Sequence, residues 1–178
     1  MNIDFHVHGS LSSKLGFDRD FFQQMTTQAQ EAGLNALALT DHFDAPDYAE
    51  IHQMLSDNYE YIDEYYFVNG MRLFPGIEVE VSEGMHLLVI ANREDMAEYY
   101  HRLKGHFDPI HYCSTAEYFQ LQVGLNTISI AAHPFRPNRE ITQVDPALYT
   151  RFDAIGLNAR DLYFLGERML MPRTQEFS

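Results

Sequence analysis

The sequence contains no tryptophan and a single cysteine, Cys113, among its 178 residues. One thiol cannot form an intramolecular disulfide, and this scarcity suits a reducing compartment. The apolar runs are short, and none approaches the ~20 residues that a membrane-spanning helix needs. The first residues alternate polar and apolar side chains, unlike the basic and then apolar order of a signal peptide. We therefore expect a cytoplasmic protein that does not enter a membrane.

Basic residues are also scarce: 12 lysines and arginines face 26 aspartates and glutamates, which gives a formal charge of −14. This charge disfavours nucleic acid as a partner, unless bound cations or a local basic patch reverse it near the site. The 46% hydrophobic and 21% charged residues are ordinary for a globular protein. A chain of this length most simply forms one domain, over residues 1–178, with a sizeable core.

The first eight residues carry the first sign of chemistry. Apolar residues alternate with Asp4, His6 and His8, which is the pattern of a strand with two different faces. His6 and His8 therefore point the same way, about 6.6 Å apart at ~3.3 Å per residue. Two imidazoles at this spacing can converge on one metal ion or on two adjacent ions. A single His-x-His pair is weak evidence by itself.

A strand, a helix and a second strand follow one another in the first part of the chain. Asp18 is suited to cap a helix that runs to about Glu31, and a short apolar run covers Asn35–Leu39. This βαβ order predicts parallel strands. His8 and His42 then fall at the carboxyl ends of their strands, which is the edge where α/β proteins bind ligands.

The middle of the chain predicts helices and then a hairpin. Residues 46–67 are polar and aromatic and are expected to form one or two helices, with the aromatic run at their end on a packed helix face. An alternating strand then places Glu78 and Glu80 on one face. The connection Ser82–Gly84 is short enough for a hairpin to the strand His86–Ala91. This hairpin would bring His86 back beside both glutamates.

The remaining elements expected are a mostly helical stretch, two strands and a final helix: residues 93–123, Thr127–Ala132, Phe152–Leu157 and 161–170. His106 and His111 lie in a loop of the helical stretch with Pro109 between them, so nothing fixes their spacing and we do not expect a metal site there. His133 follows the strand that ends at Ala132.

Metal-capable side chains thus gather at strand ends. Each would by itself be more often a structural residue than a ligand, but six together make chance a poor explanation: His6, His8, His42, Glu78, His86 and His133. Imidazole and carboxylate ligands without a thiolate suit Zn²⁺, Mn²⁺ or Fe²⁺. Because these are too many ligands for one tetrahedral ion, we expect two or more divalent ions.

Five short motifs resemble, in order and spacing, those of the PHP (polymerase and histidinol phosphatase) domain metal-dependent phosphoesterases: Asp4–His8, Thr40–His42, Pro75–Glu78, Gly84–His86 and Ala132–Pro134. The resemblance covers residues 1–165. It implies an α/β fold, a distorted (β/α)7 TIM-like barrel, with up to three divalent ions in its cleft. It also implies that Glu78 bridges two ions, with His6 and His8 on one, and His86 and His133 on the other. His42 would belong to a third ion.

Two departures from the family pattern stand out. Ser12–Lys14 occupies a place where many members have a ligand, and the ammonium of Lys14 cannot bind a cation. No Asp-x-His follows residue 8, although Asn158 and Asp161 resemble the segment that precedes this last motif in the family. We therefore expect a barrel that is incomplete at its C-terminus, whether naturally, through a frameshift or by trimming. Its open edge would favour association of copies.

The leading functional hypothesis is hydrolysis of a small phosphomonoester by a metal-activated water. Asp4 and Asp41 could orient the rings of neighbouring histidines, or could simply hydrogen-bond the strand ends. Arg136 could bind the phosphate, or be an ordinary surface arginine. The alternative function is a metal-binding but catalytically defective PHP-like protein with a structural or regulatory role.

Overall fold

The computed structural model describes residues 1–10, 16–157, 161–163 and 166. The strands are β1 (Ile3–Val7), β2 (Ala36–Leu39), β3 (Tyr61–Ile62), β4 (Tyr65–Val68), β5 (Met71–Glu80), β6 (His86–Ala91), β7 (Thr127–Ala132) and β8 (Ala154–Ile155). The helices are α1 (Arg19–Glu31), α2 (Tyr48–Asn58), α3 (Arg93–Leu103) and α4 (Thr115–Gln120). Short 3-10 turns cover Lys104–His106, Pro109–His111, Ile141–Gln143 and Pro146–Arg151.

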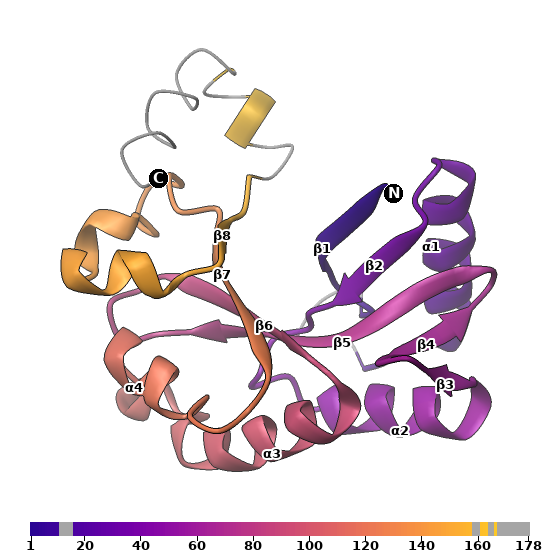
Figure 1. Cartoon of the computed structure of the whole chain (residues 1–178), viewed down its shortest axis with the longest axis horizontal. Coiled ribbons are helices and arrows are strands. Elements are labelled where there is room, and N and C mark those ends of the chain that lie inside the picture. Colours follow the sequence, from indigo (N-terminus) through magenta and orange to yellow (C-terminus); the bar gives the residue numbers. More distant parts are fainter. Residues whose placement is uncertain (11–15, 158–160, 164–165, 167–178) are drawn as a thin grey trace.

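The strands form one curled sheet in the order β1-β2-β5-β6-β7-β8, and β4 extends it beside β5 (Figure 1). Parallel pairing joins β1 to β2, β2 to β5, and β7 to β8, whereas β6 runs antiparallel to both β5 and β7. The result is an α/β fold with an open half-barrel sheet, which confirms the fold class expected from the sequence. The single-domain organisation over residues 1–178 stays a prediction.

The helix α1 and its two flanking strands form as the sequence predicts. The side chain of Asp18 caps the helix by accepting hydrogen bonds from the backbone N–H groups of Asp20 and Phe21, at 2.8 and 3.1 Å. Gly33, with φ +87°, ends it in the left-handed conformation that glycine adopts readily. The crossover makes β1 and β2 parallel, so their carboxyl ends share one edge of the sheet.

The long strand β5 connects two parts of the sheet, and Gly76 marks the change of partner. Pro75 is the last residue of β5 that pairs with β2, and Gly76 is the first that pairs with β6. A Cβ atom on Gly76 would lie 2.8 Å from Cγ2 of Thr40 and 3.1 Å from the carbonyl oxygen of Leu39, so only glycine fits. The hydroxyl of Tyr48 in α2 donates a 3.0 Å hydrogen bond to the Gly76 carbonyl.

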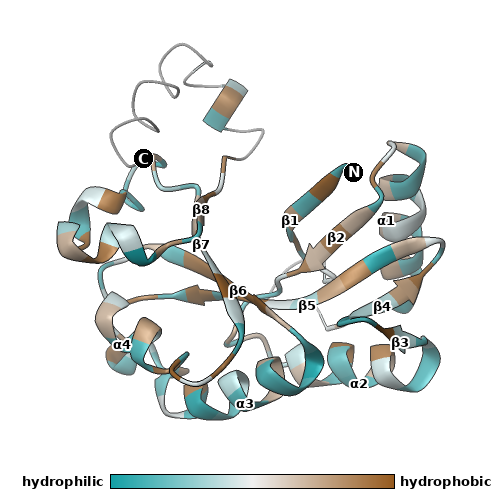
Figure 2. Cartoon of the chain, viewed as in Figure 1, coloured by the Kyte–Doolittle hydropathy of each residue, from teal (hydrophilic) through white to brown (hydrophobic). Residues whose placement is uncertain are grey.

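Side chains alternate between the two faces of the sheet. Those on the convex face pack against the helices, and Figure 2 shows the hydrophobic residues concentrated along the strands. The concave face has its own small apolar cluster of Ala38, Leu88, Ile90, Ile130 and Ala132, which is at most 4% exposed. Within the described residues, every helix is too short or too polar to cross a membrane.

The prediction of helix for the whole of residues 46–67 is wrong in its second half. α2 ends at Asn58, and β3 and β4 then form an antiparallel hairpin. Tyr66 is fully buried while its neighbour Phe67 is 49% exposed, which is the two-faced pattern of a strand. Asp63 and Glu64 at the tip both have positive φ values, 45° and 74°, as a tight hairpin turn requires. The aromatic residues, which favour strands, and the turn at residues 63–64 therefore determine the structure of this segment, in spite of its helical spacing.

Near the C-terminus, strand β8 is shorter than predicted. β8 covers Ala154–Ile155, within the longer strand expected over residues 152–157. Of the final helix expected over residues 161–170, residues 161–163 are helical, and most of the others lie outside the described residues.

Candidate metal centre

The direction of the strands brings all six predicted ligands to one edge of the sheet. β1, β2, β5 and β7 all end there, and they or the residues just after them carry His6, His8, His42, Glu78 and His133. β6 runs the opposite way, so its first residue, His86, lies at the same edge. The hairpin expected between residues 78 and 86 is confirmed, with Glu80 directly opposite His86 in the register.

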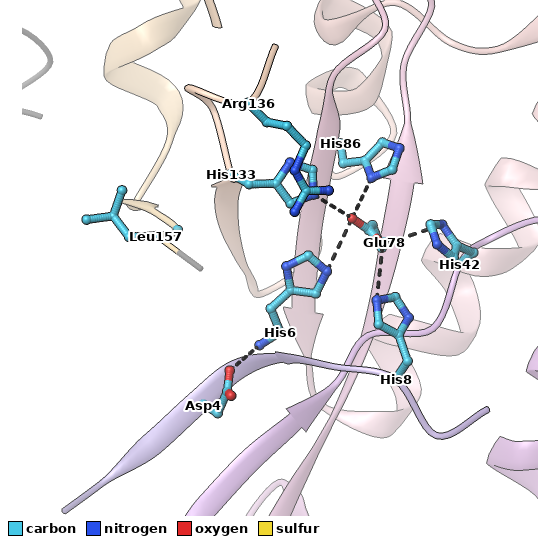
Figure 3. Close-up of a pocket in the computed structure, with 10 residues that line it drawn as sticks. Asp4, His6, His8, His42, Glu78, His86, His133, Arg136 and Leu157 are labelled. Carbon is cyan, nitrogen blue, oxygen red and sulfur yellow. Dashed lines mark hydrogen bonds and ion pairs between the residues drawn. The ribbon is translucent and has the colours of Figure 1, made fainter. Parts of the chain in front are cut away.

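The carboxylate of Glu78 lies at the centre of the cluster (Figure 3). Its side chain is 2% exposed, and five imidazoles face it. Oε1 is contacted by Nδ1 of His86 at 2.7 Å, Nε2 of His6 at 3.2 Å and Nε2 of His133 at 3.4 Å, and Oε2 by Nε2 of His8 and Nδ1 of His42, both at 3.4 Å. The site opens into a cleft of about 460 Å³, whose wall also includes Asp4, Arg136 and Leu157.

The protonation states favour binding of a cation. Burial by itself would raise the pKa of Glu78, but hydrogen bonds from His133, His6 and His86 outweigh it and hold this pKa well below its usual range. Burial lowers the pKa of His8 to about 4, although the charge of Glu78 acts in the opposite direction. Burial lowers the pKa of His133 as well. At neutral pH, therefore, Glu78 is ionised while His8 and His133 keep a free lone pair.

Two groups of side chains have the geometry to hold a metal ion. One is His6, Glu78 and His133, and the other is His8, His42 and Glu78, with ligand atoms within 4.8 Å of one another. Both groups share Glu78. They divide the histidines differently from the family resemblance, which pairs His6 with His8 and leaves His42 to a third ion.

The donor chemistry fits a divalent transition metal. The groups offer imidazole nitrogens and carboxylate oxygens and no thiolate, a set that suits Zn²⁺, Mn²⁺ or Fe²⁺. Among the described residues, neither Nδ1 of His133 nor Nε2 of His86 has a hydrogen-bond partner. In both rings it is the other nitrogen that contacts Glu78. The cluster around Glu78 has the composition of a metal site.

The backbone at His133 is in an uncommon conformation. Its φ of 34° lies in the left-handed region, which costs a non-glycine residue on the order of 1 kcal/mol or more. The turn is held by a 3.0 Å hydrogen bond from the backbone N–H of Arg136 to the carbonyl of His133. Backbone strain of this kind clusters at functional sites.

Asp41 and Asp4 make contacts other than the ring-orienting ones considered from the sequence. Asp41 is 2% exposed and accepts hydrogen bonds from the backbone N–H groups of Gly9 and Ser10 and from the Ser10 hydroxyl, at 3.0–3.2 Å. Burial nevertheless raises the pKa of Asp41. Asp4 accepts a 2.9 Å hydrogen bond from the backbone N–H of His6. These bonds fix the chain on either side of the ligands, and ring orientation by either aspartate stays a prediction.

Arg136 lines the cleft and extends beside His133 (Figure 3). Its Nε is buried, lies 3.9 Å from Oδ1 of Asp161, and makes no hydrogen bond to any described residue. Lys14 and Asn158 fall outside the described residues. His106 and His111 are apart from both metal-capable groups, and Nδ1 of His106 instead lies 2.8 Å from the carbonyl oxygen of His111.

Sequence reasoning missed one arginine near the site. Arg139 places Nη1 2.5 Å from Oε1 of Glu80, the residue opposite His86. Arg139 lies in the irregular segment after His133, where no periodicity indicates which way a side chain points. Its proximity to a second arginine, Arg136, was the only signal in the sequence.

No family model matches the chain, and no curated protein matches it. Solved structures, in contrast, do match the chain. The chain is similar to PsfC from Pseudomonas syringae PB-5123, with 25% identity and a TM-score of 0.78 over 99% of this chain and 73% of that one. It is also similar to the lesion-specific endonuclease PfuEndoQ from Pyrococcus furiosus, with 22% identity and a TM-score of 0.63 over 92% of this chain and 39% of that one. An amidohydrolase from Chromobacterium violaceum, solved with bound sulfate and no metal, has 17% identity and a TM-score of 0.51 over 92% and 81% of the two chains.

These similarities support the half-barrel fold that the strand order shows. The chain spans about three quarters of PsfC but well under half of the endonuclease. A fold shared at this identity does not by itself carry an activity from one protein to another. The function therefore depends on the chemistry of the site.

Proposed function

We propose that this protein is a metal-dependent phosphoesterase that hydrolyses a small phosphomonoester in the cleft around Glu78. The observation that carries the proposal is one buried carboxylate in contact with five imidazoles at the open edge of the sheet. The sequence resemblance to PHP-domain phosphoesterases supports the same class. Zn²⁺, Mn²⁺ and Fe²⁺ are the ions that this donor set favours.

The residues of the cleft have separate roles in this reaction. Glu78 supplies a negative charge that both metal-capable groups share. Burial keeps His8 and His133 neutral, so each ring can offer a nitrogen lone pair to a cation and does not carry a positive charge itself. Divalent ions bound by these residues would lower the pKa of a water toward neutrality and offset the charge of a phosphate.

Arg136 is the residue that we assign to the phosphate. Its side chain lies in the wall of the cleft beside His133, and a guanidinium matches two phosphate oxygens at once. A chain of formal charge −14 repels anions, so a local cation is needed to hold one. The same charge favours a small substrate over nucleic acid. Cytoplasmic location and association through the open sheet edge stay predictions.

The alternative is a protein that binds metal without turning over a phosphoester. One observation favours it: among the described residues, each metal-capable group has two imidazoles and the same single carboxylate. Two cations that share one negative charge repel each other more than cations with a carboxylate each. Such a site would fill with one ion, and its role would be structural or regulatory.

Metal content and turnover, measured on the same preparation, distinguish the two functions. The chain would be stripped with chelator, reloaded with Zn²⁺ or Mn²⁺, analysed for bound metal and assayed with p-nitrophenyl phosphate. Two ions per chain with turnover support the phosphoesterase. One tightly held ion without turnover supports the alternative, and the absence of any bound metal would rule out both.

A further inference from the structure

The ring of His86 lies between two carboxylates of the same strand. Glu78 and Glu80 are two residues apart in β5, so their side chains leave the same face of the sheet. Nδ1 of His86 is 2.7 Å from Oε1 of Glu78, and Nε2 is 3.5 Å from Oε2 of Glu80. The side chain is 10% exposed, and Nε2 is buried and makes no hydrogen bond to any described residue. The acceptor within ion-pair distance of this nitrogen is therefore Glu80.

Glu80 is itself held in place from the far side. Nη1 of Arg139 lies 2.5 Å from Oε1 of Glu80 and donates a 3.0 Å hydrogen bond to the carbonyl of Gly84. Gly84, with φ +82°, forms the turn that joins β5 to β6. One oxygen of Glu80 is thus engaged by Arg139, and the other is directed to His86.

We propose that Glu80 and Arg139 are positioning residues that fix the ring nitrogen with which His86 faces the metal centre. The inference rests on the proposed function, because it concerns how the site receives a metal ion. A neutral imidazole carries one N–H proton. Without a cation, Nδ1 donates a hydrogen bond to Glu78, the carboxylate that both metal-capable groups share, whereas a cation bound there needs the lone pair of Nδ1 instead. The proton then belongs on Nε2, where Glu80 can accept it.

The substitution Glu80→Gln tests this assignment because it keeps the shape of the side chain and replaces one acceptor oxygen with an NH₂ donor. An amide has one acceptor oxygen and one donor NH₂ group. Arg139 can only donate, so it will hold the oxygen and turn the NH₂ group toward His86. An NH₂ group at this place favours a lone pair on Nε2 and moves the proton to Nδ1. The variant should therefore have the wrong tautomer for a metal bound beside Glu78.

The second substitution, Arg139→Met, should reverse part of this effect. Without the guanidinium, the amide that E80Q introduces is free to rotate in the double variant and present its oxygen to Nε2. We expect Glu80→Gln to weaken Zn²⁺ binding by about 10-fold or more, which is typical when the partner of a ligating histidine is changed. The double variant E80Q/R139M should bind Zn²⁺ more tightly than E80Q alone, an order that simple loss of packing would not produce.

The measurements are Zn²⁺ affinity by calorimetry and the tautomer of His86 by long-range ¹H–¹⁵N correlation spectroscopy of the zinc-loaded chain. Glu98→Gln is the matched control, since Glu98 is also paired with an arginine, Arg102, but lies on α3. We expect the Nε2–H tautomer in the wild type and in the control, and its loss in E80Q. If E80Q does not fold, the single variant R139M tests the inference instead. Without Arg139, Glu80 is no longer held toward His86, so we expect the Zn²⁺ affinity of R139M to fall several-fold.

The possible failures can be told apart. A wild type that binds Zn²⁺ normally while E80Q keeps both its affinity and its Nε2–H tautomer would overturn the role of Glu80 and leave the proposed function intact. A wild type that binds no Zn²⁺, Mn²⁺ or Fe²⁺ would overturn the proposed function and this inference together.

Discussion

Glu78 determines more of the candidate site than any histidine, because both metal-capable groups use it. Glu78→Gln keeps the shape of the side chain and removes the charge that offsets cation repulsion. Glu80→Gln changes a residue that contacts His86 alone among the predicted ligands. We expect bound metal, measured by elemental analysis after reloading, to fall furthest in E78Q, less in E80Q and not at all in E98Q. Equal metal content in E78Q and E80Q would contradict the central place of Glu78.

Arg136 can also be tested by a single substitution, but the effect should appear in substrate binding rather than in metal content. Charge-assisted hydrogen bonds contribute ~1.5–3 kcal/mol, so Arg136→Met should raise KM for an aryl phosphate by about 10- to 100-fold. Bound metal should stay the same. Arg93→Met is a suitable control, since Arg93 pairs with Glu94 away from the cleft. An unchanged KM in R136M would show that Arg136 is an ordinary surface arginine that does not bind the phosphate.

His52 allows a test of pH dependence outside the metal centre. Its ring lies against that of Tyr48, tilted by 39° with 4.4 Å between centroids, and burial lowers its pKa from 6.5 to about 4, against the opposing effect of the Gly76 carbonyl. The unfolded chain therefore binds more protons than the folded chain between pH 6.5 and 4. The resulting stability is present above pH 6.5, is lost as the pH falls toward 4, and stays constant below that.

For His52 this loss amounts to about 2 kcal/mol between pH 7 and pH 4.5. Urea unfolding of the metal-free wild type and of His52→Gln would measure it, because the histidines of the metal centre cancel in the comparison. The free energy of unfolding of H52Q should fall less steeply with acid than that of the wild type. His101→Gln, which changes a histidine near the end of α3, should follow the wild type. Parallel curves for H52Q and the wild type would contradict the burial of a neutral ring.

At the scale of the elements, the features predicted from the sequence are those fixed over short distances. The cap of α1 at Asp18 depends on two neighbouring N–H groups, and the return of His86 to Glu78 depends on a short hairpin. The pairing of His6 with His133, by contrast, depends on how far the sheet curls between strands more than a hundred residues apart. No local pattern encodes this curl, and the division of the ligands among ions that the family resemblance implies stays a prediction beside the two groups that the geometry defines.

The turn between β3 and β4 has a backbone conformation that its residues adopt with difficulty. Asp63 and Glu64 both have positive φ, the conformation for which Asn-Gly is the favoured sequence. Replacing them with Asn-Gly should stabilise the chain by ~0.5–1 kcal/mol, because the strained residues give way to ones that adopt this turn readily. Chemical denaturation would measure the gain. A loss of stability would mean that residues 59–67 do not form this hairpin in solution.

At the scale of the whole molecule, the metal centre joins the two parts of the sheet that β5 connects. His6, His8 and His42 come from the part with β1 and β2, whereas His86 and His133 come from the part with β6 and β7. An ion held by His6, Glu78 and His133 therefore links strands from both parts. Binding to the native chain alone adds its free energy to the stability of the entire fold.

This linkage predicts that Zn²⁺ raises the melting temperature of the protein and that the increase depends on Glu78. At a free concentration 100 times the Kd, binding adds ~2.7 kcal/mol, which corresponds to an increase of about 5–10 °C for a chain of this size. Chelator should reverse the increase, and Glu78→Gln should abolish most of it. The double variant H106Q/H111Q should keep it in full, because these histidines lie apart from the metal-capable groups. Differential scanning calorimetry would measure all three chains. An increase that survives in E78Q but disappears in H106Q/H111Q would place the metal at the loop of residues 106–111 instead of at the edge of the sheet.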